Sequence, residues 1–319
     1  MTNSAPPSGP AGSLLTTWHQ AFFASAGQWA WLSTLNDRVS AVTQPLYDRH
    51  RSNPLVEVMH GGRWAGHSLH AALSDLPIGF WAGALVLDVV DELTGPAPSS
   101  AGRLGPAGTL SAAGLLAAGA TVATGATDWT VSDGEDRRVG LLHGLLNLAA
   151  TAVQSASLVA RLSGRRRTAA LLGLAGFGAV GAAGFVGGHL VQGRGVMVNR
   201  VAANSGPGRW VSAIEDENLP EGAMTGVVVE GRQVLLHRSD GEIHALDNMC
   251  SHAGALLSRG EVVDCAVVCP LHGSMFDLRD GRILRGPAHH PQPVLPTRVR
   301  NGWIEVRGAQ PKPRRTTSS

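Results

Sequence analysis

Two short stretches of this 319-residue chain each combine one cysteine with one histidine. Cys250 and His252 are separated by one residue, sixteen residues follow, and Cys269 and His272 are then separated by Pro and Leu. Thiolate sulfur and imidazole nitrogen are both good metal ligands, so two such loops could converge on one site. The spacing therefore predicts metal binding, with zinc or an ordinary pair of turns as the alternatives to iron.

The order of the four residues separates iron from zinc. Zinc fingers usually group Cys with Cys and His with His at other spacings. Here the pairs are C-x-H and C-x-x-H, which resembles the Rieske family, where two cysteines bind one iron and two histidines the other iron of a [2Fe-2S] cluster. The resemblance covers roughly residues 222 to 307, and it includes the runs DNMCSHAG and CPLHGSMFDL, the Asp280-Gly281 turn and Gly286-Pro287-Ala288.

The resemblance assigns roles to these residues. It implies that Cys250 and Cys269 bind the inner iron, which stays ferric, and that His252 and His272 bind the outer, redox-active iron near the surface. The third cysteine, Cys265, is predicted to be a small buried hydrophobic residue in an apolar strand.

The sequence departs from the high-potential members of that family at two pairs of positions. Ala255 and Leu271 stand where those proteins carry a disulfide between the cluster loops, so no disulfide is expected. Ser274 keeps one hydroxyl donor near the cluster, whereas Phe276 replaces a tyrosine; with Pro287, these residues form the expected surroundings of the cluster. Losing a donor disfavours the reduced cluster, so we expect a midpoint in the lower or middle part of about −150 to +300 mV.

The elements that would position these loops are short strands. Residues 210–308 contain β-branched runs separated by the turns EGR, SDGE and RDGR, which predicts an all-β domain. Residues 192–209 are expected to be a linker, and 309–319 a polar tail. Because only 11 residues follow Gly308, we expect no oxygenase catalytic domain with its own mononuclear iron site.

The first two-thirds of the chain contains long apolar runs. Four of them could each cross a bilayer, which needs about 20 apolar residues: 68–93, 104–127, 139–160 and 168–190. A buried, Ala-rich soluble bundle is the alternative. Residues 1–13 are expected to be a disordered lead-in and 14–67 a helical segment before the four-span membrane domain, 68–191. The predicted fold class is an all-α transmembrane four-helix bundle followed by an all-β Rieske-type domain.

The helical part also resembles an uncharacterised family of small four-helix bacterial membrane proteins. The resemblance rests on the run HSLHAALSDLPIGFWAGALVLDVVDEL followed by GATDW, LLHGLLN and GGHLV, and it implies no known activity. Polar side chains within the spans are costly in lipid and usually face a bundle interior. These polar side chains suggest that the bundle holds a quinone or haem b pocket. The alternative is that the bundle only anchors the electron carrier to the membrane. The candidate pocket residues are His70, Asp75, His143, Asn147 and His189.

Charge bears on partners and on sidedness. The net charge is +2 without a long basic block, so no nucleic-acid partner is expected. The four arginines within 161–167 favour a cytoplasmic location for that loop of a multi-pass cell-membrane protein, which puts the β domain outside. Opposing arginines at the other face are Arg63, Arg137, Arg138, Arg194 and Arg200.

The predicted function is one-electron transfer by a membrane-anchored Rieske cluster. Its partners would be redox donor and acceptor proteins or quinone, in contact with membrane lipid. Such a protein would be an electron-transfer component of an oxidoreductase system. The alternative is a redox-sensing or binding module that uses the cluster without steady electron flux.

Overall fold

Four long helices form the body of the N-terminal part. The computed structural model describes residues 21–95, 104–204 and 206–308, so the expected lead-in at 1–13 and the tail at 309–319 lie outside the described residues. The helices are α5 (Leu69–Thr94), α6 (Gly105–Thr130), α7 (Gly134–Leu162) and α8 (Arg166–Gly188), and α8 continues into the π-helical turn η1 (His189–Gly193). Within the described residues, these are the four helices long and apolar enough to cross a membrane. The predicted order of four apolar helices and then an all-β domain is confirmed.

Small residues let these helices approach closely, as is typical of membrane bundles. At Gly114 of α6 an added Cβ would lie 2.3 Å from the indole nitrogen of Trp81 on α5, so only glycine fits against this ring. Trp81 is buried with Ala118, Ala150 and Val180, one residue from each of the other three helices. The Ala and Gly content of the spans therefore sets how tightly the four helices pack.

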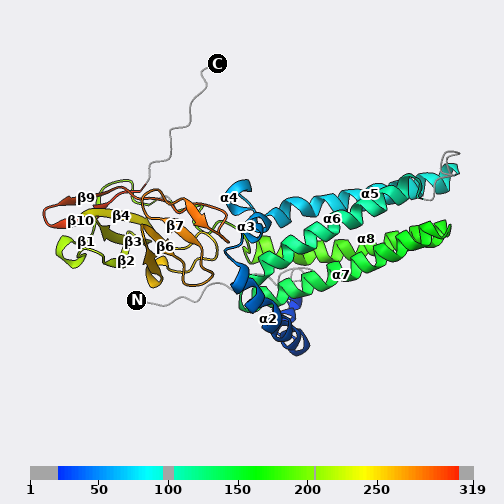
Figure 1. Ribbon diagram of the computed structural model, residues 1–319, viewed down its shortest axis with the longest axis horizontal. Coiled ribbons are helices and arrows are strands. Elements are labelled where there is room, and N and C mark those ends of the chain that lie inside the picture. The colour runs from blue at the N-terminus through cyan, green and yellow to red at the C-terminus, as the bar shows by residue number, and fades with distance from the viewer. Residues whose placement is uncertain (1–20, 96–103, 205, 309–319) are drawn as a thin grey trace, which may run out of the picture.

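Between residues 30 and 68, three shorter helices precede the bundle: α2 (Ala30–His50), α3 (Pro54–His60) and α4 (Gly62–Ala65). Asn53 caps α3 by accepting a hydrogen bond from the backbone N–H of Leu55, and Pro54 fills the first turn, where a missing N–H costs nothing. The helix ends at Gly61, which has a left-handed φ of 82°. These helices lie at the end of the bundle that faces the β domain (Figure 1).

The C-terminal part consists of ten short strands in three antiparallel sheets, ordered β1-β10-β9, β2-β3-β4 and β5-β6-β7-β8. The strands are β1 (Val211–Glu215), β2 (Met224–Val229), β3 (Arg232–Ser239), β4 (Glu242–Asp247), β5 (Glu261–Val263), β6 (Ala266–Val268), β7 (Met275–Asp277), β8 (Ile283–Arg285), β9 (Thr297–Arg300) and β10 (Trp303–Val306). The longer hairpins turn at Glu230-Gly231 and Asp240-Gly241, where both residues of each pair have positive φ.

Two apolar cores hold the β domain. One lies between the β1-β10-β9 and β2-β3-β4 sheets and includes Val234, Leu236 and Ile304. The other contains Leu235, Leu246, Phe276 and both Cys250 and Cys269. The two cysteines are therefore held in a packed core, although the loops that carry them lie at the end of the domain.

The β domain abuts one end of the helical bundle (Figure 1). The same end holds the turn between α6 and α7, residues 131–133. The segment after η1 connects the two parts and contacts both. Arg194 forms ion pairs with Glu135 and Asp136 of α7, and the backbone N–H of Arg200 donates to the carbonyl of Ser251, 3.0 Å away.

Candidate metal centre

The two cysteine loops have the same backbone hydrogen bonds. In the first, the N–H of Cys250 donates to the carbonyl of Ala255 (2.8 Å), and the N–H of Gly254 donates to the carbonyl of Cys250 (2.9 Å). In the second, Cys269 donates to Ser274 (2.8 Å) and Gly273 donates to Cys269 (3.0 Å). Gly254 and Gly273 have φ values of 80° and 74°, which favour glycine. The loops are thus two copies of one turn, each with cysteine at its start.

The thiols of Cys250 and Cys269 are close enough to hydrogen-bond to each other, and both residues are buried. Each sulfur also accepts backbone N–H bonds, from His252 and Ala253 in one loop and from Leu271 and His272 in the other. The hydrogen bond between the thiols raises the pKa of Cys250 and lowers that of Cys269 to about 6. The two backbone N–H groups at each sulfur favour its thiolate, which is the form of cysteine that binds metals.

The imidazoles meet beside the thiols. Nδ1 of His252 lies 3.2 Å from Nδ1 of His272, with the rings edge to face at 79°. Two nitrogen ligands of one tetrahedral metal, each about 2.0–2.1 Å from it, lie about 3.4 Å apart. Burial holds the pKa of His252 well below its usual value, so the ring is neutral and its lone pair available. The four side chains therefore fit an iron–sulfur group with two sulfur and two nitrogen ligands.

Ser274 and Phe276 lie in the core around the cysteines, and both are fully buried. The Ser274 hydroxyl accepts a hydrogen bond from the N–H of Ala288 (3.0 Å), which leaves its own hydrogen to donate. Pro287 precedes Ala288 and follows a cis peptide bond from Gly286. The segment 286–288 thus forms a third loop beside the two cysteine loops.

Ala255 packs against the core, whereas Leu271 is 48% exposed. The three cysteines are free. The expectation for Cys265 was wrong in its location. Cys265 lies in the turn between β5 and β6, next to Asp264 with its positive φ, and is only half-buried. The three-residue strands here are too short to include it, because the turn takes up two residues of the apolar run.

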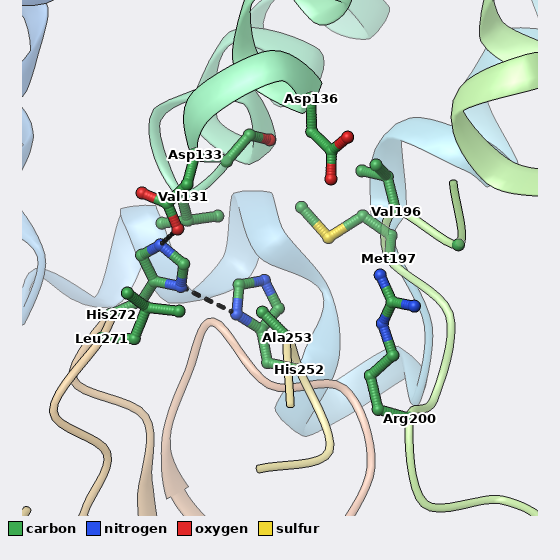
Figure 2. A pocket seen from close by; sticks show the side chains of 12 residues that line it. Val131, Asp133, Asp136, Val196, Met197, Arg200, His252, Ala253, Leu271 and His272 are labelled. Atoms are coloured by element: carbon green, nitrogen blue, oxygen red, sulfur yellow. Dashed lines mark hydrogen bonds and ion pairs between the residues drawn. The ribbon is translucent and has the colours of Figure 1, made fainter. Parts of the chain in front are cut away.

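The histidine edge of this centre faces the helical bundle across a cavity of about 180 Å³. Figure 2 shows His252 and His272 pointing toward Asp133 in the α6–α7 turn and Asp136 in the first turn of α7, with Met197 and Arg200 at the side. Oδ2 of Asp133 lies 2.7 Å from Nε2 of His272. The adjacent imidazole lowers the pKa of Asp133 although partial burial opposes the shift.

Further contacts hold the two parts together. The N–H of Gly286 donates to Oε1 of Glu57 (2.8 Å), and Nε2 of His289 donates to the carbonyl of His60 (3.1 Å). A Cβ on Gly62 would lie 2.3 Å from the carbonyl oxygen of Ala288, so the backbones meet directly there. Sequence reasoning missed Asp133, Glu57 and His60, because their partners lie far away in the chain. An acidic residue before a helix, such as Asp133, is typical of an ordinary cap.

His60 is also the middle of a buried polar network. Its Nδ1 lies 2.9 Å from Oδ1 of Asp128, its Nε2 lies 2.9 Å from the hydroxyl of Tyr47, and Ser68 donates to Oδ2 of Asp128 (2.5 Å). The network joins α2, α3, α5 and α6 directly beneath the third loop. It fixes the platform on which the β domain rests.

The candidate pocket residues of the bundle are only partly brought together. The rings of His70 and His143 lie 6.2 Å apart. Nδ1 of His70 donates to the carbonyl of Thr121 (3.0 Å), and Nδ1 of His143 to that of Ala183 (2.8 Å). Nε2 of His143 accepts from Asn147 (3.1 Å).

The other two candidates have different surroundings. Asp75 is exposed on α5, and His189 stacks on Phe23 with ring centroids 3.6 Å apart. Most of the ring nitrogens of His70 and His143 are hydrogen-bonded within the bundle. This is what a purely structural role of the two residues requires.

A β domain in which two matching loops each present one thiolate and one imidazole defines the class of iron–sulfur electron carriers with mixed ligands. The chain belongs to the Rieske [2Fe-2S] domain family, whose model matches residues 209–297. Membership in this family implies the expected [2Fe-2S] cluster. Residues 66–200 match the family described as "Predicted membrane protein (DUF2231)".

Curated relatives match the β domain over nearly their whole length. The ferredoxin component of a naphthalene 1,2-dioxygenase system from Pseudomonas aeruginosa is 36% identical over 98 residues, which is 31% of this chain and 94% of that protein. The ferredoxin subunit of a 3-phenylpropionate/cinnamic acid dioxygenase from Photorhabdus laumondii is 41% identical over 91 residues, 28% of this chain and 86% of that protein.

Among solved structures, a carbazole 1,9a-dioxygenase ferredoxin from Nocardioides aromaticivorans is similar at 29% identity and a TM-score of 0.30, over 31% of this chain and 98% of that one. The two curated relatives are a ferredoxin component and a ferredoxin subunit of dioxygenase systems, and this chain adds a helical part that those matches do not include.

Proposed function

We propose that this protein is a membrane-anchored one-electron carrier. Cys250 and Cys269 would hold the inner iron of the [2Fe-2S] cluster, and His252 and His272 the outer iron. The bound cluster supplies a centre that accepts and gives one electron at a time. The shared turn geometry of the two loops supports this assignment, because it brings both thiols together and both Nδ1 atoms together.

One observation supports exchange of electrons at the membrane side. In a Rieske centre the histidine edge is where electrons enter and leave, and here this edge lies against the α6–α7 turn. A large soluble partner could not reach His272 in this arrangement, because Asp133 covers its Nε2. The docked domain therefore favours a donor that approaches along the bundle or within the cavity.

A quinol head group is the donor whose chemistry fits this cavity. The cavity opens beside His252 and is lined by Val131, Val196 and Met197 as apolar groups and by Asp136 and Arg200 as polar groups. A ring with hydroxyl groups could use both kinds of contact, and lipid solubility would bring it to this end of the spans. The cavity is a better candidate than the His70–His143 pair, because both ring nitrogens of His143 and Nδ1 of His70 already have protein partners.

The test uses the full chain purified in detergent. We expect two irons and two acid-labile sulfides per chain, and an EPR signal with an average g below 2 after reduction. Stopped-flow mixing with decylubiquinol or a menaquinol analogue should then reduce the cluster at a rate that saturates with quinol. A protein that holds the cluster and is reduced by dithionite but never by quinol would reject the quinol donor and favour a sensing module or a protein donor.

For sidedness we propose that the β domain lies on the outer face. The support is the arginine-rich junction of α7 and α8, at the far end from the β domain: Arg161 lies in the last turn of α7, Arg165 lies in the loop, and Arg166 and Arg167 begin α8. A reporter protein fused after residue 308 tests this. We expect a fused alkaline phosphatase to be active, whereas fluorescence of a fused cytoplasmic fluorescent protein would reverse the assignment.

A further inference from the structure

We propose that Asp133 of the helical domain orients His272 and lowers the reduction potential of the cluster, so that the potential depends on docking of the β domain. The inference rests on the proposed role of His272 as a ligand of the outer iron. It adds a residue from outside the β domain to the determinants of the potential.

The contact places a carboxylate beside the outer ring nitrogen of His272. A histidine that binds metal through Nδ1 carries its proton on Nε2 and normally donates it to a carboxylate, a carbonyl or water. Nε2 of His272 is buried and has no well-aligned hydrogen-bond partner among the described residues, and Oδ2 of Asp133 lies 2.7 Å from it, within ion-pair distance. The His272 side chain is only 10% exposed, whereas that of Asp133 is 57% exposed. Asp133 is therefore the candidate acceptor for this buried N–H, and its carboxylate keeps part of its hydration.

The position of Asp133 is fixed by the helix that follows. Asp133 has extended backbone immediately before the first residue of α7, Gly134. The preceding Ser132 donates its hydroxyl to the carbonyl of Asp128, so the turn is tied to α6 as well. Two helices of the bundle thus set where this carboxylate lies.

The two histidines differ in this respect. Figure 2 shows His272 against Asp133, whereas His252 faces the cavity near Met197 and Arg200. A carboxylate acceptor makes an imidazole a stronger electron donor to its metal, which favours the oxidised iron. The predicted effect of Asp133 on the midpoint is therefore downward.

Docking maintains the contact. Glu57, His60 and Gly62 contact the third loop of the β domain at residues 286–289, and these contacts set how close His272 comes to Asp133. Because Asp133 and His272 belong to different domains, separation of the domains would remove the contact and raise the potential.

The experiment compares midpoints of the full-length protein in detergent, measured by redox titration with EPR detection. Asp133→Asn keeps the shape but weakens the acceptor, Asp133→Ala removes it, and Asp133→Glu keeps a carboxylate. Asp136→Asn is the matched control, because Asp136 lines the same cavity and loses the same charge but pairs with Arg194. We expect an upward shift for Asn, a larger one for Ala, little change for Glu, and a smaller shift for Asp136→Asn.

Equal shifts for Asp133→Asn and Asp136→Asn would mean that only charge matters, and would overturn the proposal, as would an unchanged midpoint in Asp133→Ala. A second variant tests docking. Gly62→Val should push the third loop away and raise the midpoint, and adding Asp133→Ala to it should give no further rise. If the wild-type chain holds no cluster, the proposed function fails first; a cluster whose midpoint ignores Asp133 defeats only this inference.

Discussion

Nδ1 of His252 and Nδ1 of His272 lie 3.2 Å apart, although the residues belong to separate loops. Two neutral imidazoles gain little from such a contact, since only one of the facing nitrogens can carry a hydrogen for it. A shared metal ion would account for the arrangement, because it would accept both lone pairs. The backbone turns that start at Cys250 and Cys269 bring the two rings to this position.

Loss of one ligand should abolish the cluster. We expect His272→Ala and Cys269→Ser each to lose the visible absorption and the EPR signal, with iron content falling from two per chain toward zero. Cys265→Ser is the matched control, since Cys265 lies in the β5–β6 turn. It should keep the full spectrum, and a loss of iron in this variant would show that the ligand set is misassigned.

A hydroxyl at position 276 should raise the midpoint. Phe276 is fully buried beside both cysteines, and Phe276→Tyr would restore the donor that the resemblance places near a ligand thiolate. Hydrogen bonds to cluster sulfur stabilise the reduced, more electron-rich state. Ser274→Ala removes such a donor and should shift the midpoint in the opposite direction. Parallel shifts in the two variants, measured by protein-film voltammetry, would contradict this explanation.

Acid should weaken the β7–β8 turn through Asp277. The hydrogen bond from the Arg279 side chain (2.7 Å), with further help from Arg282, lowers the pKa of buried Asp277 to about 2 from 3.8. A lowered folded-state pKa means that the carboxylate stabilises the fold fully above pH 3.8 and loses that contribution as the pH falls toward 2.

Asp277→Asn should therefore lower the melting temperature at pH 6 and matter progressively less below pH 4. Circular dichroism melts across that range measure the difference. Asp240→Asn, an exposed carboxylate in the β3–β4 hairpin, serves as the control. A destabilisation by Asp277→Asn that stays constant down to pH 2 would exclude the carboxylate as the cause.

Breaking the buried ion pair in the bundle should be costly. Arg161 binds Asp88 through both terminal nitrogens, at 2.6 and 2.5 Å, and their side chains are 10% and 12% exposed. Arg161→Met leaves the carboxylate unpaired and should cost about 3–5 kcal/mol. The exposed Arg167–Glu92 pair is the control, and Arg167→Met should change stability by about 0–1 kcal/mol. Thermal unfolding in detergent compares them; equal effects would show that Asp88 finds another partner.

The ligand types, the family resemblance and the order of four apolar helices followed by short strands can be read from the sequence. These features are local: a run of apolar residues predicts a span wherever it packs, and C-x-H with C-x-x-H is legible within two loops. The surroundings of the cluster in the β domain, such as Ser274 and Phe276, were also legible, because they follow the second cysteine within seven residues.

What lies against the histidine edge depends on the tertiary structure. Asp133 meets His272 and Glu57 meets Gly286 across separations that no periodicity records. Asp75 is exposed, whereas His70 and His143 lie near each other. The sequence does not show this difference, because the buried face of a helix depends on the neighbouring helices. The docking of one domain on another depends on complementary surfaces. The residues of one surface do not show which residues of the other domain will contact them.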